Sequence, residues 1–162
     1  MFTTRVATAG DIPLLTRIIN AAYVVERFFK AGDRIAGAGV LALQAKGRFL
    51  LLEDHGTPVG SVYVELRRDR GYIGLLAVDP GRQGSGLGRA LMNAAEDYCL
   101  RNGARHADLR VVNLRKELPP FYRHIGYVEC GIEPFSEPAE ATRACHFVLM
   151  TKSLGLQDSG AS

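Results

Sequence analysis

Four glycines lie within eight residues at Gly81–Gly88, between an apolar run and an amphipathic run. Glycine lets successive backbone N–H groups turn toward one point, and the start of a helix adds its positive end. A pyrophosphate is the natural guest of such a loop, and Arg82 and Arg89 could screen its charge. The chemistry that this stretch predicts is therefore the binding of a phosphate-bearing ligand.

Two common phosphate loops do not fit this spacing. Gly81 and Gly86 are spaced as in a Walker loop, but Leu87 stands where that loop requires lysine. A dinucleotide loop requires GxGxxG, whereas Gly84, Gly86 and Gly88 form GxGxG. Nucleotide hydrolysis and nicotinamide binding are therefore not indicated.

The glycine stretch instead matches Q/RxxGxG/A, carried by Gln83, Gly86 and Gly88, after an apolar run that ends in Val78–Pro80. A second motif downstream supplies, in order, Asn113, Tyr122, Gly126 and Tyr127. On these two motifs the sequence resembles the GNAT superfamily of acyl-coenzyme A dependent N-acyltransferases. Two further segments, Asn20–Ile35 and Cys145–Leu154, resemble the ends of one subgroup of small uncharacterised acetyltransferases within it. The resemblance covers nearly the whole predicted domain.

The resemblance implies acetyl-CoA as the acyl donor, with direct transfer in a ternary complex and no metal. In that family the fourth strand splays from the fifth at a bulge, which would make the Val78 N–H the oxyanion donor. Tyr122 would meet the leaving thiolate, and Asn113 would bind the pantetheine amide. Each residue also has an alternative role that remains open. Tyr122 could serve only as a packed aromatic side chain, and Asn113 could lie at a strand end or cap a helix. The implied donor-binding residues are Leu76, Ala77, Val78, Arg82, Gln83, Gly84, Ser85, Gly86, Leu87, Gly88, Arg89, Asn113 and Tyr122.

The sequence does not identify a general base. An alkylammonium with a pKa near 10.4 is only about one part in 2,000 neutral at pH 7, so a side chain or a water chain must take its proton. In the histone-acetylating branch of the family a glutamate occupies the position of Tyr72, and this departure counts against protein lysine as the acceptor. Glu65 and Glu26 are the candidates for the base. The alternative for each is a solvated surface carboxylate without a catalytic role.

The resemblance implies that the acceptor lies near two segments, Val24–Arg34 and Glu133–Ala144. Aromatic side chains there could form an apolar slot, with a glutamate attracting a cation. A solvated loop with its aromatics anchored in the core is the alternative. The candidate residues are Phe28, Phe29, Phe135, Glu26 and Glu133.

Hydrophobic patterning predicts the elements that must position these residues. It indicates an α/β (α+β layered) domain in the order βααβββαβαββ, with a mixed, mostly antiparallel sheet of six to seven strands flanked by about four helices. Residues 48–79 predict an antiparallel meander of three strands, and Gly86–Gly103 the clearest helix. Val40–Lys46 predicts a helix that Gly47 ends. We expect one domain over residues 1–154 and a flexible C-terminal tail over 155–162.

The composition limits the classes of protein to which the chain could belong. A chain of 162 residues with 47% hydrophobic and 23% charged residues suits one globular domain, and a net charge of +3 falls short of a nucleic-acid binder. Apolar runs are too short for a membrane span and no signal peptide is evident, so a cytoplasmic protein without a membrane partner is expected. The three cysteines and four histidines lack metal-site spacing. The sequence leaves open whether the protein forms a homodimer.

The leading hypothesis is an acetyl-CoA dependent N-acetyltransferase that acts on a small amine or amino-acid-like molecule. A different class is a non-catalytic acyl-CoA-binding sensor or interaction module with the same fold, which the lack of an assignable base keeps open. A third hypothesis keeps the enzyme but changes the acyl donor.

Overall fold

A computed structural model describes residues 1–155, so all of the predicted tail except Gly155 lies outside the described residues. The helices and strands follow the predicted order βααβββαβαββ. In chain order they are β1 (Phe2–Val6), α1 (Ile12–Ala22), α2 (Gly37–Gln44), β2 (Arg48–Asp54), β3 (Thr57–Arg67), β4 (Arg70–Val78), α3 (Leu87–Arg101), β5 (His106–Val112), α4 (Leu118–His124), β6 (Val128–Pro134) and β7 (His146–Ser153). Short 3₁₀ turns complete them, namely η1 (Ala9–Asp11), η2 (Tyr23–Phe28), η3 (Pro80–Arg82) and η4 (Pro138–Glu140).

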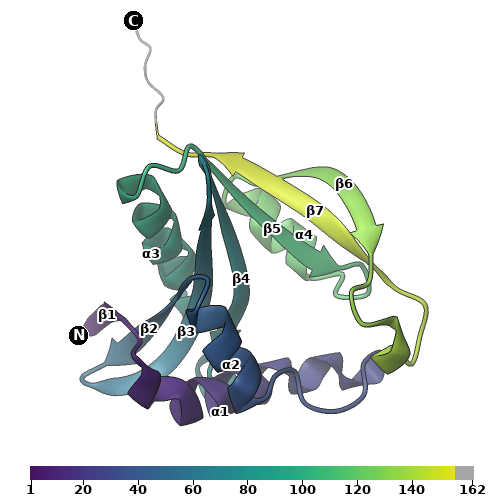
Figure 1. Ribbon diagram of the computed structural model, residues 1–162, viewed down its shortest axis with the longest axis horizontal. Coiled ribbons are helices and arrows are strands. Elements are labelled where there is room, and N and C mark those ends of the chain that lie inside the picture. The colour runs from purple at the N-terminus through teal and green to yellow at the C-terminus, as the bar shows by residue number, and fades with distance from the viewer. Residues whose placement is uncertain (156–162) are drawn as a thin grey trace, which may run out of the picture.

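The strands form one seven-stranded sheet in the order β1-β2-β3-β4-β5-β7-β6. Every neighbouring pair is antiparallel except β4 and β5, which are parallel, as a crossover through α3 requires. The predicted mixed, mostly antiparallel sheet is therefore confirmed. In Figure 1 the sheet opens like a V, with β1–β4 on one side and β5, β7 and β6 on the other.

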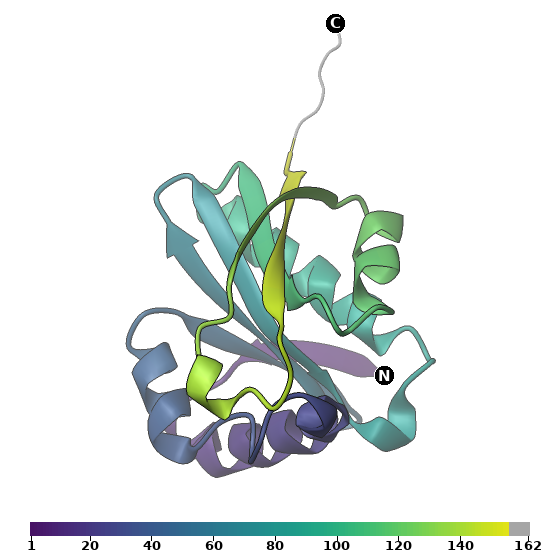
Figure 2. The same cartoon turned by 90° about the vertical axis from the view of Figure 1, so that its right-hand side faces the viewer.

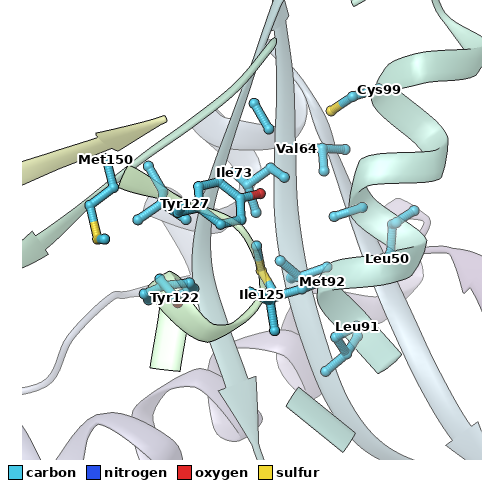
Figure 3. Close-up of a cluster of buried hydrophobic side chains, with 14 of the residues drawn as sticks. Leu50, Val64, Ile73, Leu91, Met92, Cys99, Tyr122, Ile125, Tyr127 and Met150 are labelled. Atoms are coloured by element: carbon cyan, nitrogen blue, oxygen red, sulfur yellow. The ribbon is translucent and has the colours of Figure 1, made fainter. Parts of the chain in front are cut away.

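Helices cover both faces of the sheet, so β2 is apolar at successive positions. Leu50 packs with Leu91 and Met92 of α3 in the larger core cluster (Figure 3). Its neighbour Leu51 points the other way and packs with Leu15 of α1. Because successive side chains of a strand point to opposite faces, a run such as residues 49–52 can be buried throughout.

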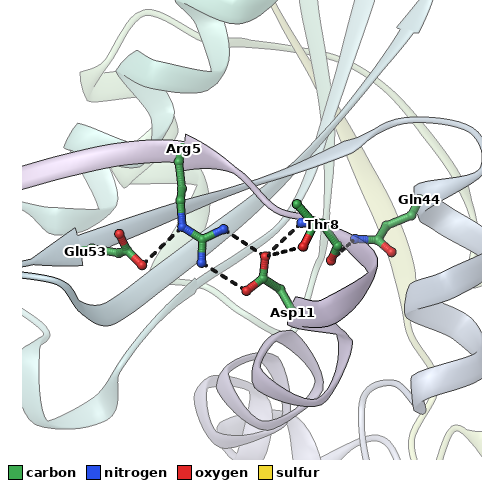
Figure 4. A network of polar contacts seen from close by, with 5 residues as sticks. All are labelled: Arg5, Thr8, Asp11, Gln44 and Glu53. Atoms are coloured by element: carbon green, nitrogen blue, oxygen red, sulfur yellow. Dashed lines mark hydrogen bonds and ion pairs between the residues drawn. The ribbon is translucent and has the colours of Figure 1, made fainter.

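A polar network fixes the start of α1 against the sheet (Figure 4). The Arg5 guanidinium of β1 donates to Asp11 at 2.8 Å and to Glu53 of β2 at 3.2 Å. Asp11 also accepts from the Thr8 backbone N–H at 2.8 Å, and Gln44 of α2 donates to the Thr8 carbonyl at 3.1 Å. The Arg5 guanidinium holds the pKa of the Asp11 carboxyl well below its usual range. These contacts set the direction in which α1 leaves the sheet.

Gly47 has a different role from the one predicted. Helix α2 ends at Gln44, and Gly47 lies just before β2 with its backbone against β3. A Cβ at this position would overlap the Val64 carbonyl and the Tyr63 ring. Close packing against the sheet therefore requires this glycine, rather than a left-handed helix end.

Helix α3 follows its prediction more closely. It runs from Leu87 to Arg101, and Gly103 follows it with a φ of 94°. Ala94 and Tyr98 are only half-buried, and the buried residues of the helix are Leu87, Leu91, Met92, Ala95 and Cys99. Across residues 1–155 no helix is both long enough and apolar enough to cross a membrane.

Candidate active site

The gap between β4 and β5 begins after only three paired residues. Arg70–Tyr72 of β4 pairs with His106–Asp108 of β5, and no further pairs form although both strands continue. Where the strands separate, β4 has a bulge: Leu75 and Leu76 together face Val62 of β3, and Leu75 has a φ of 50°. A non-glycine residue with positive φ is uncommon, and such strain is concentrated at functional sites. The expected splay and bulge of the fourth strand are both present.

The splay leaves backbone donors of β4 facing the gap. The Asp79 N–H donates to the Val59 carbonyl of β3 at 2.9 Å. Hydrogen bonds alternate in direction along an antiparallel pair, so the N–H groups of Val78 and Leu76 point away from β3 and toward β5. Because the ladder with β5 ends at Tyr72, these two groups have no partner strand within residues 1–155.

A cleft of about 700 Å³ occupies the opening between the two halves of the sheet. Side chains of β3, β4, β5, η2 and α4 line it. The sequence-predicted residues that it brings together are Glu26, Glu65, Leu76, Tyr122, Glu133 and Phe135. Phe29 is instead buried in a core cluster with Val112 and Phe147, as the alternative of an aromatic anchored in the core predicts, and Phe28 is exposed. Neither side chain lines the cleft, so of the three phenylalanines only Phe135 does.

Tyr122 projects from α4 with only 6% of its surface exposed. Two prolines occupy the first turn of α4, and the Tyr122 ring packs edge-on against Phe121 and Tyr127. The hydroxyl group reaches the cleft and makes no hydrogen bond within the described residues. Burial raises the pKa of Tyr122 well above its ordinary value of about 10, so the phenol stays protonated and can donate a hydrogen bond.

Glu26 is buried, contrary to its interpretation as a solvated carboxylate. It lies on η2 with 7% of its surface exposed, and its Oε2 accepts a hydrogen bond from Arg115 at 2.8 Å. Arg115 also pairs with the exposed Glu117 at 2.8 Å. Burial raises the pKa of Glu26, while the charge of Arg115 opposes that rise. A carboxylate with a raised pKa is better suited to accept a proton near neutral pH.

Glu65 has both carboxylate oxygens occupied. Its Oε1 accepts from the Tyr63 hydroxyl at 2.7 Å, and its Oε2 accepts from Arg67 Nε at 2.6 Å. Burial alone would raise its pKa, but the hydrogen bonds from Arg67 and Tyr63 lower the pKa of Glu65 below its ordinary value. Of the two base candidates, Glu26 therefore has the environment that favours proton uptake.

The glycine loop leaves open space where a ligand could approach. Gly84 and Gly86 have φ values of 85° and 83°, and a Cβ on either would meet no atom within 4 Å. Gly86 is the N-cap residue directly before α3, and it provides no side-chain cap for the first turn of that helix. The free N–H groups of this turn and the adjacent space fit a pyrophosphate. The Leu87 side chain is buried in the core, so only its backbone is available.

Several predicted donor-side residues already have partners within the protein, among them Arg82, Asn113 and Gln83. Arg82 pairs with Asp54 at 2.7 Å, which neutralises part of its charge, whereas Arg89 is exposed. The Asn113 Oδ1 accepts from the His146 N–H at 2.8 Å, a strand-end role that leaves only its amide nitrogen for a ligand. Gln83 reaches back to the Val78 carbonyl at 3.4 Å.

Several cleft residues are not among the site candidates named from the sequence, although Arg34 ends the predicted acceptor segment Val24–Arg34. Tyr23, Arg34 and Arg110 line the cleft, and Arg115, from the loop between β5 and α4, fixes Glu26. None belongs to a motif, because they come from separate loops and strands that meet only in the folded chain. Residues 29–31 also pair with 140–142 through two backbone hydrogen bonds and the Lys30–Glu140 ion pair, which ties the two halves together at the open end.

Comparison with known proteins agrees with this geometry. The profile of the acetyltransferase (GNAT) family matches residues 13–127. Streptothricin acetyltransferase of Streptomyces lavendulae is 33% identical over 76 residues, which cover 47% of this chain and 40% of that protein. The chain thus spans about two fifths of the length of this curated relative.

Two solved structures have the same fold over nearly their whole length. Ribosomal-protein-S18-alanine N-acetyltransferase from Escherichia coli superposes with a TM-score of 0.78 at 18% identity, covering 100% of this chain and 99% of that one. A Salmonella typhimurium protein described as an acetyltransferase, solved with its cofactor acetyl-CoA, gives 0.73 at 20% identity, covering 98% and 96%. At these identities the likeness concerns the fold alone.

Proposed function

The chain belongs to the GNAT family of acetyltransferases, and on that premise we propose that it transfers an acetyl group from acetyl-CoA to a small amine. The observation that carries this proposal is the meeting, in one cleft, of the free β4 backbone at Leu76 and the side chain of Tyr122. The curated relative named for streptothricin acetylation and the acetyl-CoA-bound structural neighbour support the donor and the acceptor class.

In the proposed reaction the amine nitrogen attacks the thioester carbonyl carbon, a C–N bond forms and the C–S bond breaks. The N–H groups of Val78 and Leu76 would stabilise the negative charge on the carbonyl oxygen. Tyr122 would donate its hydrogen bond, or its proton, to the departing sulfur. Glu26 would accept the ammonium proton, directly or through water, and a small acceptor suits the tied end of the cleft.

The donor would lie with its pyrophosphate at Gln83–Arg89 and its pantetheine arm along Leu76–Val78. Support comes from the uncapped α3 N-terminus and from the open space beside Gly84 and Gly86. Asn113 would contribute its amide nitrogen, and Arg82 only the charge that Asp54 leaves available.

The decisive experiment measures release of free CoA from acetyl-CoA while the purified protein is given a panel of amines, peptides and amine-bearing antibiotics. We expect release with small amines and none with lysine-containing peptides. Thermal stabilisation by CoA without release on any acceptor would overturn catalysis and favour a sensor of the same fold. Repeating the assay with propionyl- and succinyl-CoA tests the choice of acyl group.

A further inference from the structure

Among the buried and half-buried positive side chains of the cleft, one has no ion-pair partner within residues 1–155. Four cations that are buried or half-buried line the cleft, and three of them form ion pairs at 2.6–2.8 Å. These three pairs are Lys30 with Glu140, Arg70 with Asp108 and Arg110 with Glu133. The fourth, Arg34, has no carboxylate within 4.0 Å anywhere in residues 1–155. Partial burial of an unpaired charge is costly, which suggests that a ligand completes the pair.

Arg34 is held in place before any ligand arrives. The Asn20 side chain of α1 donates to the Ile35 carbonyl at 2.8 Å and accepts from the Ile35 N–H at 2.9 Å, which fixes the backbone next to Arg34. The Arg34 guanidinium lies over the Tyr23 ring, 5.4 Å from its centroid. A fixed, planar guanidinium is well suited to bind a carboxylate. Because these contacts already order the Arg34 side chain, binding a ligand would cost little further side-chain entropy.

The proposed base lies in the same part of the cleft. Tyr23 and Glu26 both belong to η2, and both line the cleft together with Arg34. The charge of Arg34 is near enough to act on Glu26, as one of the cations that oppose the effect of burial on the pKa of that carboxyl. The acceptor end of the cleft thus presents one fixed positive group close to one negative group.

The phosphates of the donor are not the expected partner of Arg34. In Figure 2 helix α2, which follows Arg34, and turn η3, which opens the glycine loop, lie on opposite sides of the fold. We therefore attribute the expected anion at Arg34 to the acceptor rather than to the donor phosphates.

We propose that Arg34 binds a carboxylate of the acceptor, so that the preferred acceptors are small amino carboxylates, which carry an amine and a carboxylate a few bonds apart. This inference rests on the proposed acetyl transfer. The amine would face Glu26 while the carboxylate pairs with Arg34, and the guanidinium would set the direction from which the amine approaches.

The test uses matched acceptors that share one amine and differ only in a carboxylate or a carboxamide. We expect the wild-type kcat/KM for CoA release to be about 10- to 100-fold higher with the carboxylate, the range of a charge-assisted hydrogen bond. Arg34→Gln is expected to remove this preference by slowing the carboxylates alone, and Arg34→Lys to restore part of it. Arg27→Gln serves as the control, since Arg27 is exposed and pairs with Asp33 away from the cleft.

Equal rates for the two acceptor classes in the wild type, or an equal loss for both in Arg34→Gln, would overturn the role of Arg34 and leave acetyl transfer standing. A binding measurement separates the two proposals if no acceptor is turned over. With CoA present, amino carboxylates should raise the melting temperature of the wild type and not that of Arg34→Gln. Identical shifts in both proteins would refute the inference.

Discussion

Tyr122 and Glu26 are both buried ionisable groups, and burial shifts both of their pKa values upward. For the phenol this means that the proton is retained, and for the carboxylate that a proton is taken up more readily. The two groups therefore suit opposite tasks in one transfer, hydrogen-bond donation to the sulfur and acceptance of a proton from the amine. Their roles follow from the environment rather than from the residue types.

Removing the Tyr122 hydroxyl tests its proposed role. Tyr122→Phe is expected to lower kcat about 100-fold, within the range of general acid catalysis, and to leave CoA affinity nearly unchanged. Stability should hold, because the hydroxyl makes no hydrogen bond within residues 1–155. Tyr98→Phe removes the same atom on α3, outside the cleft lining, and is the control. An unchanged kcat, with chemistry shown to limit the rate, would contradict the role.

Glu26 should determine how the rate depends on pH. A base works when deprotonated, so kcat at saturating acceptor should fall as the pH drops through the pKa of Glu26, at a higher pH than for an ordinary carboxylate. Glu26→Gln is expected to lower kcat about 100-fold and to abolish this acidic limb.

Glu117→Gln is the matched control for Glu26, since both carboxylates pair with Arg115 and Glu117 is exposed. It should retain both the rate and the acidic limb. An acidic limb that persists in Glu26→Gln would assign that titration to the acceptor's ammonium instead.

At the scale of elements, the glycine loop and the start of α3 form a unit whose function depends on the absence of side chains. Gly86→Val would place a branched side chain in the open space beside the first turn of α3. We expect CoA to lose its ability to raise the melting temperature of this variant.

Gly103→Val provides the comparison that separates strain from lost binding. Gly103 lies at the other end of α3, has a φ of 94° and also has open space at its Cβ. Both variants should lose stability by roughly 1–2 kcal/mol, the cost of a left-handed conformation for a residue with a Cβ. Retention of CoA stabilisation in Gly86→Val would refute the assignment of the loop.

The sequence predicted those elements whose signals are local. The periodicity of hydrophobic residues and the turn residues predicted the three-stranded meander and helix α3, and the spacing of the glycines predicted the loop between them. Gly47 was misassigned because its requirement comes from β3, whose approach no local pattern records. Arg115 and Arg34 were missed because their significance depends on Glu26 and Tyr23, which reach them only through the tertiary fold.

At the scale of the whole molecule, the fold holds two half-sheets together at both ends of an opening. At one end β4 and β5 share three residue pairs, and at the other residues 29–31 contact 140–142. Contacts at both ends fix the width of the cleft without filling it. The acceptor and donor sites therefore both depend on these two sets of contacts, although the residues that form the sites lie far apart in the chain.

The short β4–β5 ladder has a consequence for the backbone itself. β4 is the central strand of a seven-stranded sheet, yet beyond Tyr72 the described part of the chain gives it a neighbour on one side only. Half of its amide protons there should exchange with solvent as readily as those of a strand at the rim of a sheet. The pantetheine of a bound donor would take the place of the missing strand, so the centre of the sheet would reach full protection only in the complex.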